Sequence, residues 1–477
     1  MVQFTSDLAA PGTALDHFWE HTVGSGHAPL ALRADWQRQL ARCRRELGFR
    51  HVRFHGILSD PMGTLTCQQE RLLYSFFNAD SIIDYLLSIG MRPFVELSFM
   101  PTTLASGAET VFRYQGNVTP PRDYRAWAAL IQKLVHHWVD RYGVAEVREW
   151  YFEVWNEPNL HAFWTGTQAD YFELYRHTAE AIKRVDPGLR VGGPASAKNA
   201  WITEFLDFCD GHGIAADFVS THHYPTDAFG APGDDTITQL AKSHRGAMRE
   251  EAQGARDRAR GHPLYYTEWN TSSNSRDLLH DQPYAAAFVV NTILEASGLV
   301  EGYSFWVFTD VFAENYYASV PFHGGFGLLN LQGIPKPTYS AYLILHGLGT
   351  ELLPVEGSHA TVNCWVVKGA GETTVILTNH ALPRHPIARE VVQISLAGVS
   401  AAPRSVTIVR IDEDHANPYR AWTGMGSPEY LSAAAVSALE ADAVLSRRSF
   451  PATLEGDSLR LEVGLPPHAV AAIALER

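Results

Sequence analysis

Short β-like runs alternate with longer amphipathic segments from residue 15 to residue 337, and this alternation limits the possible folds more than any other feature. Strands that alternate with helices indicate a parallel sheet. Eight such units predict a (β/α)8 TIM barrel. The eight runs that we interpret as strands are 16–22, 51–58, 92–100, 150–157, 190–195, 218–224, 263–270 and 302–310.

The segments between these runs have helical periodicity. In 121–141 the apolar residues recur at intervals of three and four, which places them on one helical face. Segments 168–185 and 283–298 follow the same spacing, and we expect Gly298 to end the second. The alternative is a doubly wound open sheet, which usually has fewer strands and a glycine-rich phosphate turn after the first. The eight runs favour the closed barrel.

Beyond residue 340 the pattern changes to short alternating runs with no helix between most of them. This pattern is typical of an antiparallel β-sandwich. We therefore divide the chain into a barrel domain, 15–337, and a sandwich domain, 338–477, to which residues 1–14 could add. A looped and partly helical insertion, 415–447, interrupts the sandwich.

Composition and charge exclude several classes of partner. The chain has 52 acidic and 38 basic residues, a net charge of −14, and no run of Lys or Arg that could follow a phosphate backbone. We therefore expect no nucleic-acid partner. No run of about 18 apolar residues could span a bilayer, so we expect no membrane association. The oligomeric state stays open.

The ends of the chain and its cysteines bear on location. The first residues have neither a basic region nor a continuous apolar stretch, so we identify no signal peptide. Four scattered cysteines without CxxC spacing are most simply free thiols. Both features favour a cytoplasmic protein.

Two of the predicted strands end in a glutamate, at the carboxyl ends where a barrel of this kind carries its functional groups. Glu157 follows Trp155-Asn156, and Glu268 precedes Trp269. Hydrolysis of a glycoside needs one carboxylic acid to protonate the leaving oxygen and a second carboxylate as nucleophile or base. Taken singly, either glutamate could instead be a solvated or ion-paired rim residue. Together, beside aromatic and amide neighbours, they indicate a catalytic pair.

Several runs around these glutamates resemble glycoside hydrolase family 39, and within it the bacterial β-xylosidases. The resemblance implies that Glu157 is the acid/base, that Glu268 is the nucleophile, and that the anomeric configuration is retained. The runs that carry it span nearly the whole chain; they are RFHGIL (53–58), EVWNEPN (153–159), THHYP (221–225), YTEWN (266–270), FWVFTD (305–310) and NPYRAW…MGSPEYL (417–431).

Arg53 and His55 share the inward face of the second strand, because strand side chains alternate. Arg53 could bind Glu268 and keep it ionised, as a nucleophile must be. Alternatively, Arg53 forms a structural ion pair with Glu96 or Glu153. We expect His55 to contact the sugar.

His222 and Tyr224 share one face of the sixth strand. We expect the Tyr224 hydroxyl to bind the nucleophile and His222 to hold a sugar hydroxyl, unless it is a satisfied core histidine. Asn156 could bind the 2-hydroxyl, a contact that strengthens in the transition state. Strict alternation cannot direct both Asn156 and Glu157 inward, so the strand must bend before Pro158.

Two further candidates belong to the predicted eighth strand and its loop: Trp306 lies in the outer part of the strand, and Glu314 follows it. Trp306 could form a platform under the bound sugar, or it could simply pack the barrel. Glu314 could bind sugar hydroxyls, which the family resemblance supports more than the residue pattern does. The chain has no HExxH spacing, Walker loop or G-x-S-x-G elbow, so we expect no metal and no other cofactor.

These features predict an exo-acting retaining glycosidase, a β-xylosidase on xylo-oligosaccharides, with carboxyl groups roughly 5–5.5 Å apart. Long loops at 101–120 and 225–237 could close the pocket. An α-L-iduronidase would need cations for the uronate, and the strand ends show no basic cluster apart from Arg53. An α-L-arabinofuranosidase is a further alternative. A non-catalytic carbohydrate-binding barrel would normally lose one carboxylate.

Overall fold

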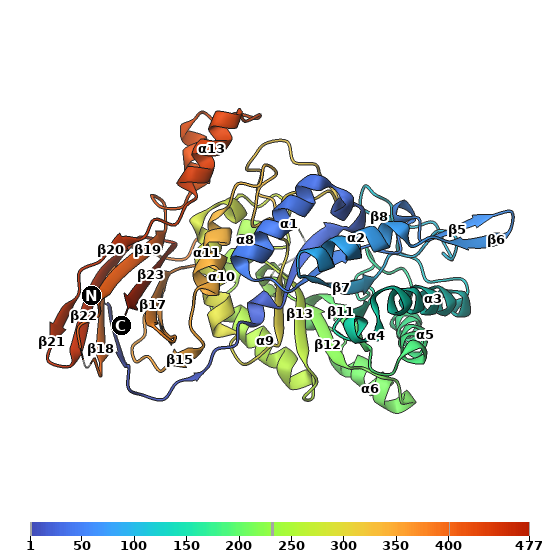
Figure 1. Cartoon of the computed structure of the whole chain (residues 1–477), viewed down its shortest axis with the longest axis horizontal. Helices are drawn as coiled ribbons and strands as arrows, with labels where there is room; N and C mark the ends of the chain where they lie inside the picture. Colours follow the sequence, from blue (N-terminus) through green and yellow to red (C-terminus); the bar gives the residue numbers. More distant parts are fainter. Residues whose placement is uncertain (1, 230–232, 400, 477) are drawn as a thin grey trace.

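The computed structural model describes residues 2–229, 233–399 and 401–476. Eight parallel strands close into a barrel (Figure 1), which confirms the predicted architecture and excludes the open sheet. Around the barrel the order is β10-β11-β12-β13-β14-β3-β4-β7. The strands are β3 (Thr22–His27), β4 (His51–His55), β7 (Arg92–Leu97), β10 (Tyr151–Val154), β11 (Arg190–Ser196), β12 (Phe218–His222), β13 (Leu264–Trp269) and β14 (Gly302–Phe305).

The first barrel strand differs from the prediction. Residues 16–22 were expected to form it, but Phe18–Glu20 is a 3-10 turn and the strand is Thr22–His27. A β-carbon at Gly24 would lie 2.6 Å from the Trp306 ring, so only glycine allows this close approach. The strand has the sequence TVGSGH, in which small residues replace the alternating apolar side chains on which the prediction depended.

Helices cover the outside of the barrel. In α5 the side chain of Thr167 accepts from the Asp170 backbone and the Asp170 side chain from the Thr167 backbone, a capping box that starts the helix where the periodicity placed it. The helices are α1 (Ala34–Leu47), α2 (Phe77–Ser88), α3 (Tyr124–Tyr142), α4 (Val144–Val147), α5 (Gln168–Val185), α6 (Ile202–His212), α7 (Pro225–Phe229), α8 (Thr236–Lys242), α9 (Ala247–Arg258), α10 (Pro283–Glu295) and α11 (Pro337–His346). The helix α10 ends three residues before Gly298, which nevertheless has the left-handed φ of 78° of a chain reversal.

The last third of the chain folds into two sheets that are antiparallel apart from one added strand, as expected for a sandwich. The N-terminal residues join both sheets, because β1 pairs in parallel with β18 and β2 pairs with β15. The sandwich lies against α10 and α11 (Figure 1). Its strands are β1 (Val2–Asp7), β2 (Thr13–Ala14), β15 (Glu351–Leu353), β16 (Val362–Lys368), β17 (Glu372–Asn379), β18 (Glu390–Ala397), β19 (Ser405–Ile411), β20 (Arg448–Ser449), β21 (Thr453–Glu455), β22 (Ser458–Leu465) and β23 (Ala469–Glu476).

Additional elements surround the two domains. The 415–447 insertion contains α12 (Pro418–Gly424) and α13 (Ala433–Asp442), and Trp422 of α12 packs on Phe322 in the loop after β14. Two short hairpins follow the barrel strands; they are β5 (Leu65–Gln68) with β6 (Arg71–Tyr74), and β8 (Thr110–Val111) with β9 (Gly116–Asn117). Within the described residues, none of the helices combines the length and the apolar character needed to cross a membrane.

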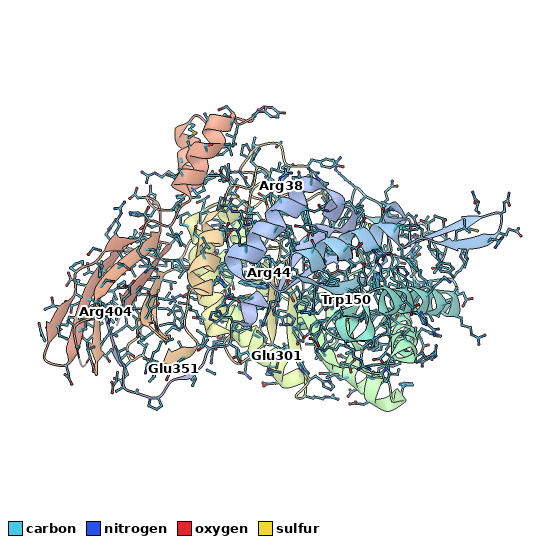
Figure 2. All side chains as sticks on the ribbon, viewed as in Figure 1. Arg38, Arg44, Trp150, Glu301, Glu351 and Arg404 are labelled. Carbon is cyan, nitrogen blue, oxygen red and sulfur yellow. The ribbon has the colours of Figure 1, made fainter. Side chains whose placement is uncertain are left out.

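The two ends of the barrel differ in character. At the amino end, Trp150 and Glu301 (both labelled in Figure 2) precede β10 and β14. Glu301 accepts hydrogen bonds from the Leu264 backbone at 2.6 Å and from Arg256 at 2.6 Å, a structural arrangement. The carboxyl end carries buried ionisable groups around a cavity, which is the end where enzymes of this fold act.

Candidate active site

The two glutamates at the strand ends meet at the carboxyl end of the barrel. Glu268 lies within β13 and Glu157 follows β10. One carboxylate oxygen of each lies within 4.8 Å of the other, and the two residues are 5% and 8% exposed. Both line a cavity of about 240 Å³.

The chain bends at Asn156 and Glu157, as predicted, because regular strand alternation could not direct both side chains into the cavity. The strand β10 ends at Val154, and Trp155 and Glu157 have left-handed φ values of 73° and 44°. The Glu157 N–H donates to the Ala195 carbonyl at 2.8 Å, which holds the bend against the end of β11. Such unfavourable backbone angles persist only when the surrounding structure imposes them.

Glu268 is surrounded by donors. Arg53 Nη1 donates to its Oε1 at 2.8 Å and the Tyr224 hydroxyl donates to its Oε2 at 3.0 Å. A guanidinium and a hydroxyl that both donate to a carboxylate favour its charged form. Arg53 also lies 2.5 Å from Glu153 and 2.9 Å from Glu96, so the nucleophile contact and the structural ion pairs exist together. These carboxylates raise the pKa of Arg53 above its usual value although burial opposes them.

Glu157 has different surroundings. Burial raises its pKa to about 7, although the positive charges of His55, Arg53 and Lys198 oppose this shift. Its Oε1 lies 3.0 Å from His222 Nδ1. Burial lowers the pKa of His222 to about 4, so this imidazole is neutral near pH 7. Glu157 can therefore hold a proton at neutral pH, whereas Glu268 accepts hydrogen bonds from Arg53 and Tyr224.

His55 and Glu314 form a second pair at the opposite wall. Burial opposes a charge on His55, but Glu96, 2.6 Å from its Nδ1, raises its pKa to about 9. Its Nε2 faces oxygens of Glu268 and Glu314 at 3.7 and 3.6 Å. Burial raises the pKa of Glu314 to about 8, and its Oε1 has no hydrogen-bond partner among the described residues.

Asn156 and Trp306, two further expected residues, also line the cavity. Asn156 Oδ1 accepts from Arg53 at 2.9 Å, while its buried Nδ2 has no partner in the described part of the chain. Trp306 lines the cavity, with its ring centroid 4.7 Å from that of His55. His222 fits the alternative of a satisfied core histidine, because both ring nitrogens contact protein groups, Glu157 and Thr267.

Three residues of this region were missed. Lys198 and Asp227 line the cavity from the loops after β11 and β12, and Thr267 lies behind His222 on β13. Lys198 is a further cation near the strand ends, in addition to Arg53. It lies in a turn with a left-handed φ of 63°, beyond any strand pattern. No motif in the sequence marks these positions. Thr267 is adjacent to Glu268 in the strand, so alternation predicts that its side chain points away from the face that carries Glu268.

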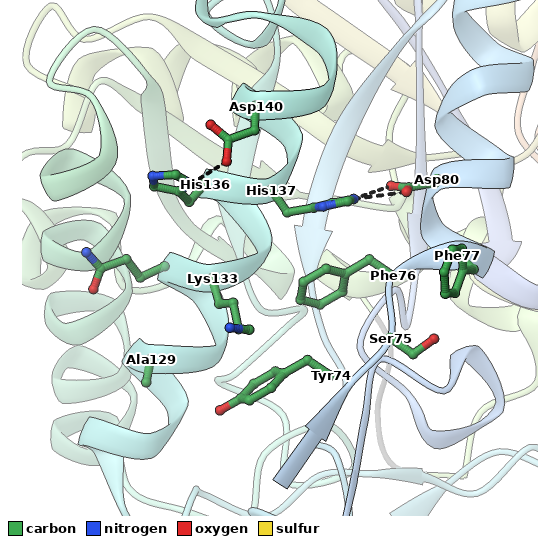
Figure 3. Close-up of a pocket in the computed structure, with 11 residues that line it drawn as sticks. Tyr74, Ser75, Phe76, Phe77, Asp80, Ala129, Lys133, His136, His137 and Asp140 are labelled. Carbon is green, nitrogen blue, oxygen red and sulfur yellow. Dashed lines mark hydrogen bonds and ion pairs between the residues drawn. The ribbon is translucent and has the colours of Figure 1, made fainter.

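Two other arrangements do not compete with this site. Glu157, His222 and Glu268 could each offer an atom to a metal ion, but Arg53 and Tyr224 already occupy both oxygens of Glu268. A larger cavity of about 760 Å³ lies outside the barrel between α2 and α3 (Figure 3). Its polar groups pair with one another, His137 with Asp80 and His136 with Asp140, and it contains no opposed pair of carboxyl groups.

Comparison with known proteins agrees with this geometry. The model of the glycosyl hydrolases family 39 matches residues 3–454. A β-xylosidase of Caldicellulosiruptor saccharolyticus is 47% identical over 97% of this chain and 96% of its own, and one of Geobacillus stearothermophilus is 38% identical over 88% and 85%. The crystal structure of a monomeric β-xylosidase from Caulobacter crescentus CB15 superposes with a TM-score of 0.88 at 34% identity, covering 100% of this chain and 99% of that one. The chain therefore belongs to glycosyl hydrolase family 39 and is a glycosidase.

Proposed function

We propose that this glycosidase is an exo-acting β-xylosidase that works by double displacement, with Glu268 as nucleophile and Glu157 as acid/base. The observation that carries the proposal is the unequal pair of carboxyl groups. Their oxygens lie within 4.8 Å, as a retaining mechanism requires, whereas inverting enzymes separate them by about 6.5–9.5 Å. Burial raises the pKa of Glu157, while Arg53 and Tyr224 donate to Glu268.

In the first step a Glu268 oxygen bonds to the anomeric carbon while the bond to the leaving oxygen breaks. Glu157 transfers its proton to that oxygen, and the product leaves as an alcohol. Glu157, now a carboxylate, takes a proton from water, whose oxygen attacks the glycosyl-enzyme and releases Glu268. Each carboxyl group returns to its starting state after the two steps.

The size of the cavity supports action on a chain end. Pockets for drug-sized ligands hold about 300–1,000 Å³, and this cavity is about 240 Å³. It suits one sugar ring rather than a segment of polysaccharide. Trp306 provides an aromatic face for that ring, and the unpartnered Asn156 Nδ2 and Glu314 Oε1 can bind its hydroxyls.

A xyloside fits the glycone side of this cavity better than a uronide. A uronate carboxylate needs a free cation, and Arg53 is already bound to Glu153, Glu96 and Glu268. The charge of His55 is likewise paired with Glu96. The 47% identity to a β-xylosidase supports the same choice.

The leaving group lies on the side of the loops after β11 and β12. Glu157 follows β10, which neighbours β11 in the barrel, and the acid must face the departing oxygen. Lys198 and Asp227 line the cavity after β11 and β12, and Trp306 and Glu314 line it after β14. Lys198 forms no ion pair or hydrogen bond with any described residue, so its ammonium is available to a second sugar.

The test replaces Glu268 by Ala and assays p-nitrophenyl β-xyloside, α-L-iduronide and α-L-arabinofuranoside with and without azide. We expect the wild type to prefer the xyloside, and the variant to be inactive until azide restores turnover as an α-xylosyl azide. A β-xylosyl azide would exchange the roles of the two glutamates. Preference for another glycoside would refute the xyloside assignment, and absence of turnover by the wild type would favour a binding barrel. The variant Glu301→Ala at the opposite end of the barrel is the control.

A further inference from the structure

A continuous chain of hydrogen bonds passes behind the cavity and joins the two catalytic glutamates. Arg53 binds Glu268 through Nη1 and Glu153 through Nε, at 2.8 and 2.5 Å. The Thr267 hydroxyl donates to the other oxygen of Glu153 at 2.7 Å. His222 then connects Thr267 to Glu157, with 3.0 Å at each ring nitrogen.

The single proton of the Thr267 hydroxyl determines which ring nitrogen of His222 is protonated. A hydroxyl donates once and accepts through its lone pairs, and a carboxylate such as Glu153 can only accept. Because Thr267 donates to Glu153, its oxygen must face a donor at its other contact, and that contact is His222 Nε2. If Nε2 lacked a proton, two lone pairs would face each other at 3.0 Å in a fully buried site.

His222 therefore carries its one proton on Nε2. Burial lowers the pKa of His222 to about 4, so a second proton on Nδ1 is absent near neutral pH. The bare Nδ1 faces Glu157 Oε1 at 3.0 Å and can only accept. A protonated Glu157 fits this acceptor and an ionised one does not.

We infer that Thr267 is a positioning residue, which fixes the tautomer of His222 so that Glu157 is held as the protonated acid. This inference rests on the proposed role of Glu157 as acid/base. It gives His222 a defined task, to receive the proton of the resting acid in a hydrogen bond. The same contact aims that proton until the leaving oxygen takes it.

Other charged groups also face Glu157, and the test must leave them unchanged. They are Arg53 and His55 on β4, Glu96 on β7, Glu268 on β13, Lys198 after β11, Asp227 after β12 and Glu314 after β14. Replacing Thr267 by valine removes one hydroxyl, keeps the side-chain shape and changes none of these side chains. It also removes the donor to Glu153, which Thr267→Ser keeps, so the serine variant is the matched control.

In Thr267→Val the Nε2 proton of His222 loses its acceptor, so the tautomer with the proton on Nδ1 becomes favourable and stabilises ionised Glu157. We expect the basic limb of kcat/KM for xylobiose to move to lower pH by about one unit, since a hydrogen bond to a charged group has that order of effect. Thr267→Ser, which keeps the hydroxyl, should restore the wild-type limb. A limb that stays in place in Thr267→Val, or moves equally in Thr267→Ser, would overturn the inference.

A second measurement does not depend on catalysis or on the stability of the valine variant. In the intact enzyme labelled with ¹⁵N-histidine, we expect His222 to show the shifts of a neutral ring protonated on Nε2, with the signal assigned by its loss in His222→Asn. A proton on Nδ1 would refute the inference even if Glu157 is the acid. Conversely, failure of the azide experiment would refute the proposed function without changing this spectrum.

Discussion

The variant Lys336→Met should reveal how strongly a buried ion cluster supports the loop that forms one wall of the active site. Lys336 is 0% exposed and precedes α11. Its ammonium lies 2.7 Å from both Asp281 and Asp310 and donates to the Gly325 carbonyl at 2.8 Å. The loop it holds includes Phe326, which lines the catalytic cavity.

Methionine has a similar shape and no charge, so the variant leaves two buried carboxylates without a cation. Asp281 would keep its bond from the Gly324 N–H, and Asp310 its bond from the Gly327 N–H. Removal of one partner from a buried ion pair destabilises a protein by about 3–5 kcal/mol. We expect a loss of this order in the free energy of unfolding at pH 8.

The loss of unfolding free energy in Lys336→Met should become smaller as the pH falls. Burial already raises the pKa of Asp281 in the native protein. Without the lysine, burial and repulsion from the neighbouring carboxylate raise the folded-state pKa of Asp281 further above the unfolded value. A raised folded pKa adds stability below the unfolded value, and this stability is lost as the pH rises through the folded pKa. The deficit should therefore be smaller at pH 5 than at pH 8.

The assay is urea unfolding followed by tryptophan fluorescence at pH 5 and pH 8, for the wild type and Lys336→Met. Lys133→Met is the matched control, because Lys133 is exposed on α3. A loss below about 1 kcal/mol, or one equal at both pH values, would refute the reasoning. The double variant Lys336→Met/Asp310→Asn should recover part of the loss at pH 8.

The remaining predictions concern the acid and the leaving group. Because burial raises the pKa of Glu157 to about 7 and the acid acts protonated, kcat/KM for xylobiose should fall about tenfold per pH unit above that value. Glu157→Gln should abolish this limb in a pH–rate profile on an activated aryl xyloside; an unchanged limb would assign it to another group. Lys198→Met should lower kcat/KM for xylobiose about tenfold, by loss of a charged hydrogen bond, and leave p-nitrophenyl xyloside nearly unchanged. An equal fall on both substrates, compared with Lys198→Arg, would place Lys198 outside the leaving-group side.

Local sequence patterns were enough to predict the order of the elements and the two glutamates to which we assign the reaction. Apolar periodicity is local, so it marks which face of a segment is buried whatever the partner is. All eight predicted strands overlap barrel strands, the first only at Thr22, and the bounds of α5 are those that its periodicity predicted. Placing Glu157 and Glu268 at strand ends needed nothing beyond local pattern and the rule that barrel strands end at the active site.

The contacts of each of these residues could not be predicted from local patterns, because they depend on how the barrel closes. Arg53 and Glu268 are 215 positions apart, and no local pattern could choose between Glu268, Glu153 and Glu96 as partners of Arg53. Barrel closure brings all three to one guanidinium, because interior positions of neighbouring strands share a single core. The strand at Gly24 was misplaced for the same reason, since the Trp306 ring that demands a glycine there comes from the other end of the domain. Lys198 and Thr267 could be recognised as functional candidates only from their neighbours Glu157 and His222. The fold brings these residues together, and the sequence spacing does not indicate it.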